Sequence, residues 1–430
     1  MSETVENSAL QAQVRYSRLA AASRPPVISD LMQRALTNPD LLSLAAGFTD
    51  NALLPVNLIA EAVQALAQTS VSTEWLQYGT CAGRPGLRTA ALKWLRQQPG
   101  ETLAERTADD VLIANGSQQA LYLAVQTLCD PGDIFLVESP SYFVFLELIS
   151  GLGVRAISLP ATPDGSIDPQ RNQDLLHRLK ADGETKRIKG LYLQGYFANP
   201  TGSCLTLDSK LELARLLADM ELSLPVLEDG AYRDLYFETP YPIPSVLSLE
   251  PWEAFPRLYL GTFTKPLATG LKVGFAVSSD AEWLQKLCNT KGHQDFGTAN
   301  ANQAIVEHLL ENDRYTSLLE STRPRYAAKA QRLMNALKAG GLLELGWRWH
   351  APKGGLLLWL EGPSGLATGP DSDFCAACLE AGVMYVPGSL CFADGQPDNC
   401  VRLSFGAIEA NRIEEAAQRF CAVAARFSAR

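Results

Sequence analysis

Apolar runs and amphipathic segments alternate along the chain between about residues 110 and 280. The apolar runs predict short strands, and the segments between them carry apolar residues at helical spacing. The predicted strands cover 111–114, 134–138, 154–159, 188–194, 224–228, 257–261 and 273–277, and the predicted helices cover 117–128, 143–150, 169–182 and 207–220. This alternation is typical of a mostly parallel sheet covered by helices on both faces. Such sheets bind ligands beyond the carboxyl ends of their strands.

The remainder of the chain predicts a second, smaller α/β unit. A helical stretch over 299–339 precedes apolar runs at 354–360, 383–385 and 400–404, and a helix over 409–424 closes the chain. Residues 1–45 lack the strand–helix alternation, and no flexible linker separates the two units. We therefore expect an N-terminal segment, 1–45, that packs on the small unit, a large domain over 46–310 and a small C-terminal domain over 311–430.

The charge balance argues against several classes of partner. The chain has 430 residues, and 37 Lys and Arg against 47 Asp and Glu give a net charge of −10. Binding to nucleic acid or to an anionic membrane surface needs a basic face, so we expect neither partner. The N-terminus lacks the basic and apolar regions of a secretory signal. No apolar stretch reaches the roughly 18 residues that a membrane-spanning helix needs.

Nine cysteines are scattered along the chain, an odd number that is too sparse for a disulfide framework. Reduced thiols and a cytoplasmic location fit this usage. The close pair Cys375 and Cys378 fits one face of a helix. The four histidines show no metal-ligand spacing, so we expect no metal site.

Two of the predicted strands lead into polar turns. Strand 111–114 is followed by Asn-Gly-Ser-Gln at 115–118, which opens a helix. A helix N-terminus presents unpaired N–H groups and can bind an anion, although a serine there can equally act only as a cap. Strand 188–194 leads into Asn-Pro-Thr-Gly at 199–202, which on its own predicts a turn.

Two further strands end in charged residues. Asp229 follows strand 224–228, and Lys265 follows strand 257–261. A charge beside an apolar strand is costly to bury unless a partner meets it, and the two residues could form a structural ion pair. A buried lysine can instead be deprotonated and become a nucleophile. The ion pair does not explain why these residues share consecutive strand ends with the two polar turns.

The combination of these segments resembles the class I/II aminotransferases, the fold-type I enzymes that use pyridoxal 5′-phosphate (PLP). The resemblance covers nearly the whole chain. In family order, the matching segments are SLAAG at 43–47, QYG at 77–79, NGSQQA at 115–120, SPSY at 139–142, NPTG at 199–202, EDGAY at 228–232, GTFTK at 261–265, VPG at 386–388 and VRLSF at 401–405. It implies a large PLP-binding α/β domain with a mostly parallel sheet flanked by helices and a smaller α/β domain.

The resemblance also implies roles around the cofactor ring. Lys265 is implied to form the Schiff base with PLP and then to move the proton between the substrate Cα and the cofactor. Asp229 would face the pyridine nitrogen and keep it protonated, which makes the ring an electron sink. Asn199 and Tyr232 would hydrogen-bond the phenolic oxygen of the ring. Tyr142 would stack on its face.

Further roles concern the phosphate, the substrate and a second subunit. The residues implied to hold the phosphate with the helix N-terminus are Ser117, Gln118 and Thr262. Arg402 would bind the substrate α-carboxylate through both arms of its guanidinium, beside Asn199 and the backbone around Gly47. Tyr78 is similar to a tyrosine that reaches the phosphate of the neighbouring subunit, so the resemblance implies a homodimer with shared active sites.

The chain departs from the family pattern in two places. The family commonly has serines before the lysine and an arginine seven residues after it; here Thr262 and Thr264 precede the lysine and Lys272 follows. Lys272 can meet a phosphate as a point charge rather than as a fork. Relatives that act on acidic or kynurenine-like side chains often have an arginine where this chain has Ser29 and Asp30. The resemblance therefore carries no acidic side-chain preference, and Asp30 could favour a cationic substrate or act as a cap.

The resemblance leaves more than one function open. The first is transamination, in which an L-amino acid gives its amino group to a 2-oxo acid. The second is elimination, cyclisation or oxidation with the same cofactor, because all of these begin with removal of the Cα proton. A PLP-binding regulator is a third class, but such regulators carry an added DNA-binding domain. Here only about 40 residues precede Gly47 and the net charge is −10, so we expect an enzyme.

Overall fold

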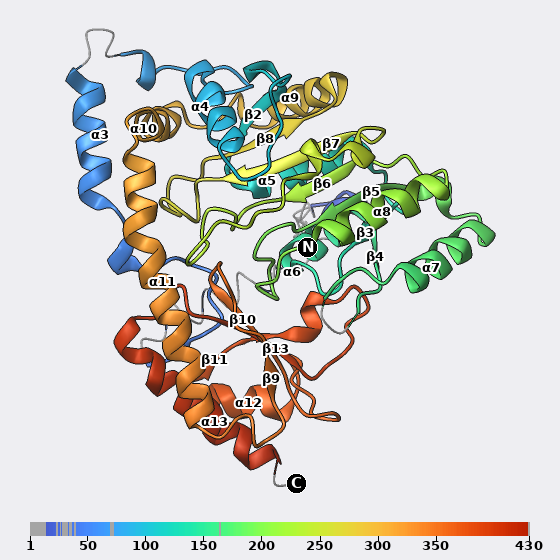
Figure 1. Cartoon of the computed structure of the whole chain (residues 1–430), viewed down its shortest axis with the longest axis vertical. Coiled ribbons are helices and arrows are strands. Elements are labelled where there is room, and N and C mark those ends of the chain that lie inside the picture. Colours follow the sequence, from blue (N-terminus) through green and yellow to red (C-terminus); the bar gives the residue numbers. More distant parts are fainter. Residues whose placement is uncertain are drawn as a thin grey trace, which may run out of the picture.

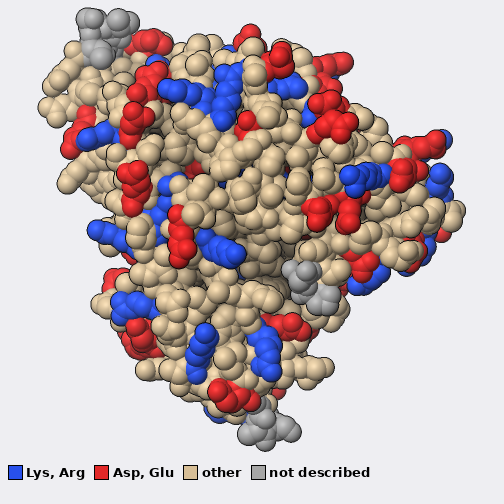
Figure 2. Space-filling model, in the orientation of Figure 1, with Lys and Arg blue, Asp and Glu red and all other residues tan. Residues whose placement is uncertain are grey.

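The computed structural model describes residues 14–22, 25, 27, 33, 37, 40–68, 73–162 and 165–428. Ser29 and Asp30 lie outside these residues. Within them, no helix is long and apolar enough to cross a membrane. Acidic and basic side chains are interspersed over the face shown in Figure 2.

A seven-stranded sheet forms the centre of the larger, upper part of the molecule in Figure 1. Its strands, in spatial order, are β2 (Val111–Ala114), β8 (Gly274–Ser278), β7 (Arg257–Thr262), β6 (Val226–Asp229), β5 (Ile188–Leu193), β3 (Ile134–Val137) and β4 (Arg155–Ser158). All neighbours pair in parallel except β8, which is antiparallel to both β2 and β7. A strand is present at each of the seven predicted places.

Alternation along each strand decides which helices cover which face, because successive side chains point to opposite sides of a sheet. Phe135 and Val137 of β3 pack with α5 (Gly116–Leu128), α6 (Phe143–Gly151) and α9 (Ala281–Asp295). Ile134 and Leu136 of the same strand pack with α7 (Pro169–Ala181) and α8 (Leu207–Asp219). Over the β2–β7 part, this second face contacts α4 (Pro85–Arg96) and α10 (Asn300–Glu311). All of these strands except the edge strand β4 are buried on both faces, as their continuous apolar runs predict.

The lower part of the molecule contains a second sheet (Figure 1). Its antiparallel strands are β12 (Val386–Pro387), β13 (Cys400–Ser404), β10 (Leu357–Glu361) and β9 (Arg348–Trp349), in that order. Helices α12 (Asp373–Glu380) and α13 (Ile413–Ser428) pack beside it. Leu42 and Ser43 form β1 (Leu42–Ser43), which pairs in parallel with β11 (Val383–Met384). The domain limits at 45 and 310 stay a prediction.

The prediction of a single helical stretch over 299–339 is wrong in one respect. The structure divides it into α10 and the long α11 (Arg314–Ala339), which meet at Asn312 and Asp313. Asp313 has a left-handed backbone with φ 54°, which a continuing right-handed helix does not allow. Figure 1 shows α11 running from the upper part of the molecule to the lower part. The remaining described α-helices are α1 (Arg18–Ala22) and α3 (Val56–Gln68).

Candidate active site

The predicted site residues of the large sheet lie at the carboxyl ends of its neighbouring parallel strands. Asp229 is the last residue of β6, and Thr262 is the last residue of β7. The register pairs Asp229 with Leu260, so β7 extends just past β6 at this edge. Asn199 follows β5 by a short loop, and Lys265 follows β7. The topology therefore brings the polar turns and the charged strand ends to one edge of the sheet.

The carboxylate of Asp229 is held by two hydrogen bonds. The hydroxyl of Tyr192, on β5, donates to Oδ2 at 3.0 Å, and the backbone N–H of Ala231 donates to Oδ1 at 2.9 Å. Burial raises the pKa of Asp229 to about 6, and the two hydrogen bonds oppose that rise. A buried carboxylate whose oxygens are both fixed presents its charge in one defined direction.

Lys265 does not form the ion pair that could have explained it together with Asp229. Its amine donates to the backbone carbonyl of Gly47, and no salt bridge among the described residues joins it to a carboxylate. Burial, and then the positive charges of Arg402 and Lys272, lower the pKa of Lys265 to about 8. An amine in this environment is neutral for a substantial fraction of the time near neutral pH.

Arg402 lies on β13 of the second sheet and is only 2% exposed. Its Nη1 donates to Oδ1 of Asn199 at 3.0 Å, and its Nη2 donates to the carbonyl of Ala45 at 2.7 Å. Among the residues that the structure describes, its buried Nε has no hydrogen-bond partner. The guanidinium thus joins the N-terminal segment, the loop after β5 and the second sheet, and it retains donor capacity for an anion.

The N-terminus of α5 packs closely against the loop that follows β7. Gly116 begins the helix with φ +69°, and a Cβ there would lie 3.3 Å from Oγ1 of Thr264. A Cβ on Gly274 would lie 2.8 Å from the backbone N of Ser117. Only glycines permit this approach. It leaves the first N–H groups of α5 beside the hydroxyls of Thr262 and Thr264, a cradle suited to an anion.

Two tyrosines lie close to Asp229 and Arg402. Burial raises the pKa of Tyr232 to about 12, with smaller opposing effects from Arg402 and Asp229. Burial also raises the pKa of Tyr142, and Tyr232, Asp229 and Arg402 all contribute to its shift. The Tyr142 hydroxyl donates to Oε1 of Gln118 at 3.5 Å, which connects it to the first turn of α5.

Three other predicted residues have more open surroundings. Within the described part of the chain, a Cβ on Gly47 would meet nothing within 4 Å, so its backbone borders free space there. Lys272 is exposed, with φ 56°, yet its charge contributes to the pKa shift of Lys265. Tyr78 is 88% exposed, and its backbone N–H donates to Oε1 of Gln77 at 3.0 Å.

The sequence model of the family described as Aminotransferase class I and II matches residues 39–420. The chain belongs to this family. It is 34% identical over 382 residues to the 2-aminoadipate transaminase of Thermus thermophilus, with 89% of each chain covered. The matches confirm the predicted family.

Solved structures give the same result. The fold is similar to that of Pyrococcus horikoshii kynurenine aminotransferase, with a TM-score of 0.85 and 26% identity over 96% of this chain and 97% of that one. It is also similar to alpha-aminoadipate aminotransferase from Thermus thermophilus, complexed with N-(5′-phosphopyridoxyl)-L-leucine, with a TM-score of 0.81 and 32% identity over 96% of this chain and 98% of that one. These likenesses confirm the fold-type I α/β fold. The aminotransferase is PLP-dependent.

The residues at the strand ends fit this cofactor. PLP carries an aldehyde, a pyridine nitrogen, a phenolic oxygen and a phosphate. The aminotransferase offers a lysine amine with a lowered pKa, a buried carboxylate and an N-terminal helix cradle that a Cβ would obstruct. The guanidinium of Arg402 lies close enough to Lys265 for its positive charge to lower the pKa of the lysine.

Sequence reasoning missed three groups behind the site. Tyr192 fixes Asp229, and Gln194 bonds the backbone of Asn199. Asp295, on α9, accepts from the side chain of Asn115 at 2.9 Å and from the buried Lys291 at 2.8 Å, which steadies the start of α5. A tyrosine or glutamine at the end of an apolar strand must find a polar partner when buried, and this is the only signal that the sequence offers.

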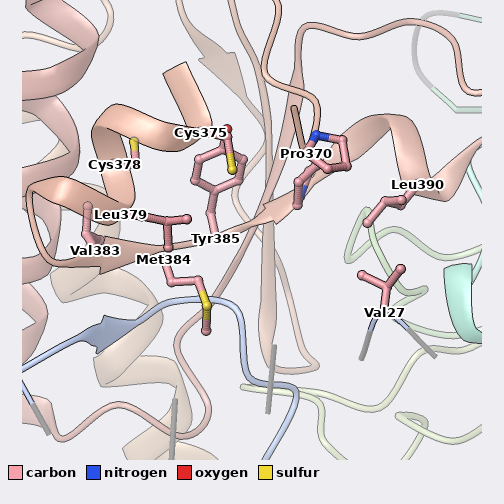
Figure 3. A pocket seen from close by; sticks show the side chains of 10 residues that line it. Val27, Pro370, Cys375, Cys378, Leu379, Val383, Met384, Tyr385 and Leu390 are labelled. Atoms are coloured by element: carbon pink, nitrogen blue, oxygen red, sulfur yellow. The ribbon is translucent and has the colours of Figure 1, made fainter. Parts of the chain in front are cut away.

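The cysteine pair noted in the sequence lines a separate pocket of about 100 Å³ (Figure 3). The pocket lies between α12 and the β11–β12 segment, and its walls are mostly apolar. The residues that line it are Val27, Pro370, Cys375, Cys378, Leu379, Val383, Met384, Tyr385, Pro387 and Leu390. None of the predicted site residues is among them, so this pocket is distinct from the strand-end site.

Proposed function

We propose that the aminotransferase moves the amino group of an L-amino acid to a 2-oxo acid, with Lys265 as the residue that binds PLP. The observation that carries the proposal is the Lys265 amine, which bonds a backbone carbonyl instead of a carboxylate and whose pKa is lowered to about 8. A lysine with this environment can supply a neutral amine at the edge of the sheet where the other polar strand ends meet.

When bound, PLP supplies an electron sink that stabilises negative charge at the substrate Cα. Asp229 would hold the proton on the pyridine nitrogen, and its fixed carboxylate supports that role. The amine of Lys265 would accept the proton from the substrate Cα and deliver it to the cofactor. Asn199 and Tyr232 would bond the phenolic oxygen, and Tyr142 would cover the ring face.

The phosphate would lie at the N-terminus of α5. Ser117 and Gln118 belong to the first turn of this helix, and Thr262 lies on the opposite side of the close approach. Lys272 would add a positive charge from the loop that follows. The cradle supports this assignment because the start of α5 lies beside the hydroxyls of Thr262 and Thr264.

The substrate α-carboxylate would bind Arg402. Its guanidinium is buried and oriented by Asn199 and Ala45, and the bonds of a planar fork to a carboxylate are strong and directional. The backbone at Gly47, which borders open space, would lie beside the same carboxylate. The Thermus relative acts on 2-aminoadipate and the Pyrococcus neighbour on kynurenine, so acidic and aromatic donors belong in the first substrate panel.

We further propose that the aminotransferase is a cytoplasmic homodimer with shared active sites. Tyr78 would reach the phosphate of the second subunit, and its 88% exposure in the single chain supports this. The exposed apolar side chains of Val56, Leu76 and Phe296 add surface that a second copy could cover. None of the nine cysteines, all within the described residues, forms a disulfide, which suits a reducing compartment.

An absorption experiment tests the proposed reaction. The purified holoenzyme is titrated with a panel of L-amino acids without any oxo acid, and a 2-oxo acid is then added. We expect the visible band of the bound cofactor to bleach with one donor and to return with the oxo acid. Release of ammonia without stable bleaching would contradict transamination and indicate elimination. A protein that takes up PLP but bleaches with no amino acid would also contradict the proposal.

A further inference from the structure

The side chain of Gln194 forms a two-bond clamp on the backbone of Asn199. Oε1 of Gln194 accepts from the N–H of Asn199 at 2.9 Å, and Nε2 of Gln194 donates to the carbonyl of Asn199 at 2.9 Å. Both residues are buried, with about 5% of each exposed. The amide of Gln194 therefore satisfies both backbone polar groups of Asn199 at once. Rotation of the amide by 180° would place donor against donor and acceptor against acceptor, so its orientation is fixed.

The clamp is itself fixed from the sheet side. The backbone N–H of Gln194 donates to Oε2 of Glu138, which directly follows β3, at 2.6 Å. Gln194 directly follows β5, so its main chain continues a central strand. The side chain thus projects from a rigid support.

Asn199 depends on this support. The turn around it is closed by bonds from Ala198 N to Ser203 O and from Gly202 N to Ala198 O, each 2.7 Å long. Within the described chain, no backbone group bonds the N–H or carbonyl of Asn199 itself. Gln194 supplies those two contacts, so it decides where the Cα of Asn199 lies relative to the sheet.

The position of Asn199 in turn affects Arg402. A guanidinium has donors only, so the 3.0 Å contact requires that Oδ1 of Asn199 faces Arg402. The guanidinium also donates to the carbonyl of Ala45, and its Cζ lies 5.2 Å from the centroid of the Phe143 ring. Among the described residues, Nε has no hydrogen-bond partner. A shift of the asparagine would remove one of the two hydrogen bonds that orient the buried guanidinium within the described chain.

We propose that Gln194 is a positioning residue for substrate binding, which acts through Asn199 to hold Arg402 in the orientation that receives the α-carboxylate. The inference rests on the proposed role of Arg402 and adds a residue that does not touch the substrate. It predicts a larger effect on amino-acid binding than on the chemical step, because Arg402 bonds Asn199 directly, whereas the amine of Lys265 bonds Gly47.

Steady-state kinetics of the PLP-loaded Gln194→Met enzyme test the inference. Methionine has similar length and volume but lacks the donor and the acceptor of the amide, so it removes the clamp with little loss of packing. We expect the KM for the amino donor to rise about tenfold with kcat within about threefold, as expected for loss of one orienting bond to a charged group. An unchanged KM, or a fall in kcat alone, would overturn the proposal.

Gln303→Met is the matched control. Gln303 is fully buried, its Oε1 accepts from Arg84 N at 2.8 Å, and its Nε2 donates to Thr298 O at 2.7 Å. The substitution therefore removes the same kind of amide from the same kind of environment, away from Asn199. We expect a similar loss of thermal stability and a KM within about twofold of the parent. An equal rise of KM in both variants would show a general structural effect and contradict the proposal.

Two more variants keep the test decisive. If Gln194→Met does not fold, Gln194→Glu retains an oxygen for the N–H of Asn199 and loses the donor to its carbonyl, so we expect a KM between those of the parent and a fully unclamped enzyme. Arg402→Lys distinguishes failure of the proposed carboxylate role of Arg402 from failure of the positioning role of Gln194. If Arg402→Lys leaves KM unchanged, the proposed carboxylate role fails. If Arg402→Lys raises KM and the Gln194 variants do not, only the positioning role fails.

Discussion

Nη1 of Arg402 donates to Oδ1 of Asn199 at 3.0 Å, although 203 residues separate the two in the sequence. Arg402 belongs to the second sheet and Asn199 to the loop after β5 of the central sheet. The candidate substrate site thus exists only when both parts of the fold are in place. The contact also orients the asparagine amide, because only its oxygen can accept from a guanidinium.

Replacing Arg402 by lysine is expected to weaken amino-acid binding more than it slows chemistry. An ammonium keeps the charge but cannot bind a carboxylate through a planar fork. We expect the KM for the amino donor to rise about 100-fold, which corresponds to the roughly 2–3 kcal/mol of a charge-assisted pair. Steady-state kinetics measure this. A variant with the parental KM and a reduced kcat would contradict the carboxylate role.

Replacing Lys265 by alanine is expected to abolish the visible absorbance of the bound cofactor and to reduce transamination by at least about 1,000-fold. Lys272, the next lysine along the chain, is exposed, so we do not expect it to replace the amine at the strand end. Absorption spectra and a coupled oxo-acid assay measure the two effects. The exposed Lys286→Ala variant is the control and should behave like the parent. A yellow Lys265→Ala enzyme that still turns over would refute the assignment.

PLP uptake by the apoprotein should depend on pH through Lys265. The amine reacts as the neutral form, and its pKa is lowered to about 8 by burial and then by Arg402 and Lys272. About a tenth of the amine is then neutral at pH 7, against about one part in 3,000 for an ordinary lysine. Uptake followed by absorbance should accelerate as the pH rises through 8 and level off above about 9.

Substitution of Lys272 by methionine provides an internal check on the pH dependence of PLP uptake. Removal of the positive charge raises the pKa of Lys265, so the curve should move to higher pH. A parental rate that continues to rise up to pH 10 would show that Lys265 keeps an ordinary pKa or is not the reacting amine.

Loss of the Tyr192 hydroxyl should act through Asp229. The hydroxyl donates to Oδ2 and lowers a pKa that burial raises to about 6. Tyr192→Phe should therefore raise the pKa of Asp229, so less of the carboxylate is ionised at pH 6 than at pH 8. We expect kcat/KM to fall about tenfold at pH 6 and about threefold at pH 8, since one bond to a charged group is lost. Asp229→Asn should lose activity at both pH values. An equal loss of kcat/KM at pH 6 and pH 8 in Tyr192→Phe would contradict an effect through the ionisation of Asp229.

The central sheet could be predicted from the sequence because its strands, apart from the edge strand β4, are buried on both faces. Such strands form continuous apolar runs, so β5 and β7 lie within one residue of their predicted ends. The break between α10 and α11 could not be predicted in this way. It depends on a left-handed Asp313, a conformation that leaves no mark in the apolar pattern.

The candidate site was only partly accessible to sequence reasoning. Motif order led to Lys265, Asp229, Asn199 and Arg402, and the structure brings them to one edge of the sheet; their roles stay predictions. Gln194 and Tyr192 have no such motif. Each acts through a hydrogen bond to a backbone or side chain whose position depends on the folded loop, and a single sequence does not contain that geometry.

The buried pair of Lys210 and Glu228 offers a test of stability beside the site. Nζ of Lys210 lies 2.5 Å from Oε1 of Glu228, both side chains are fully buried, and Val246 N donates to the other carboxylate oxygen at 2.7 Å. Lys210→Met would leave a buried carboxylate without its cation, which costs about 3–5 kcal/mol. The comparison is Arg332→Met, which breaks the half-exposed pair with Glu414 and should cost less than about 1 kcal/mol. Denaturant unfolding of the PLP-loaded variants measures both, and equal losses would show that burial does not control the strength of these pairs.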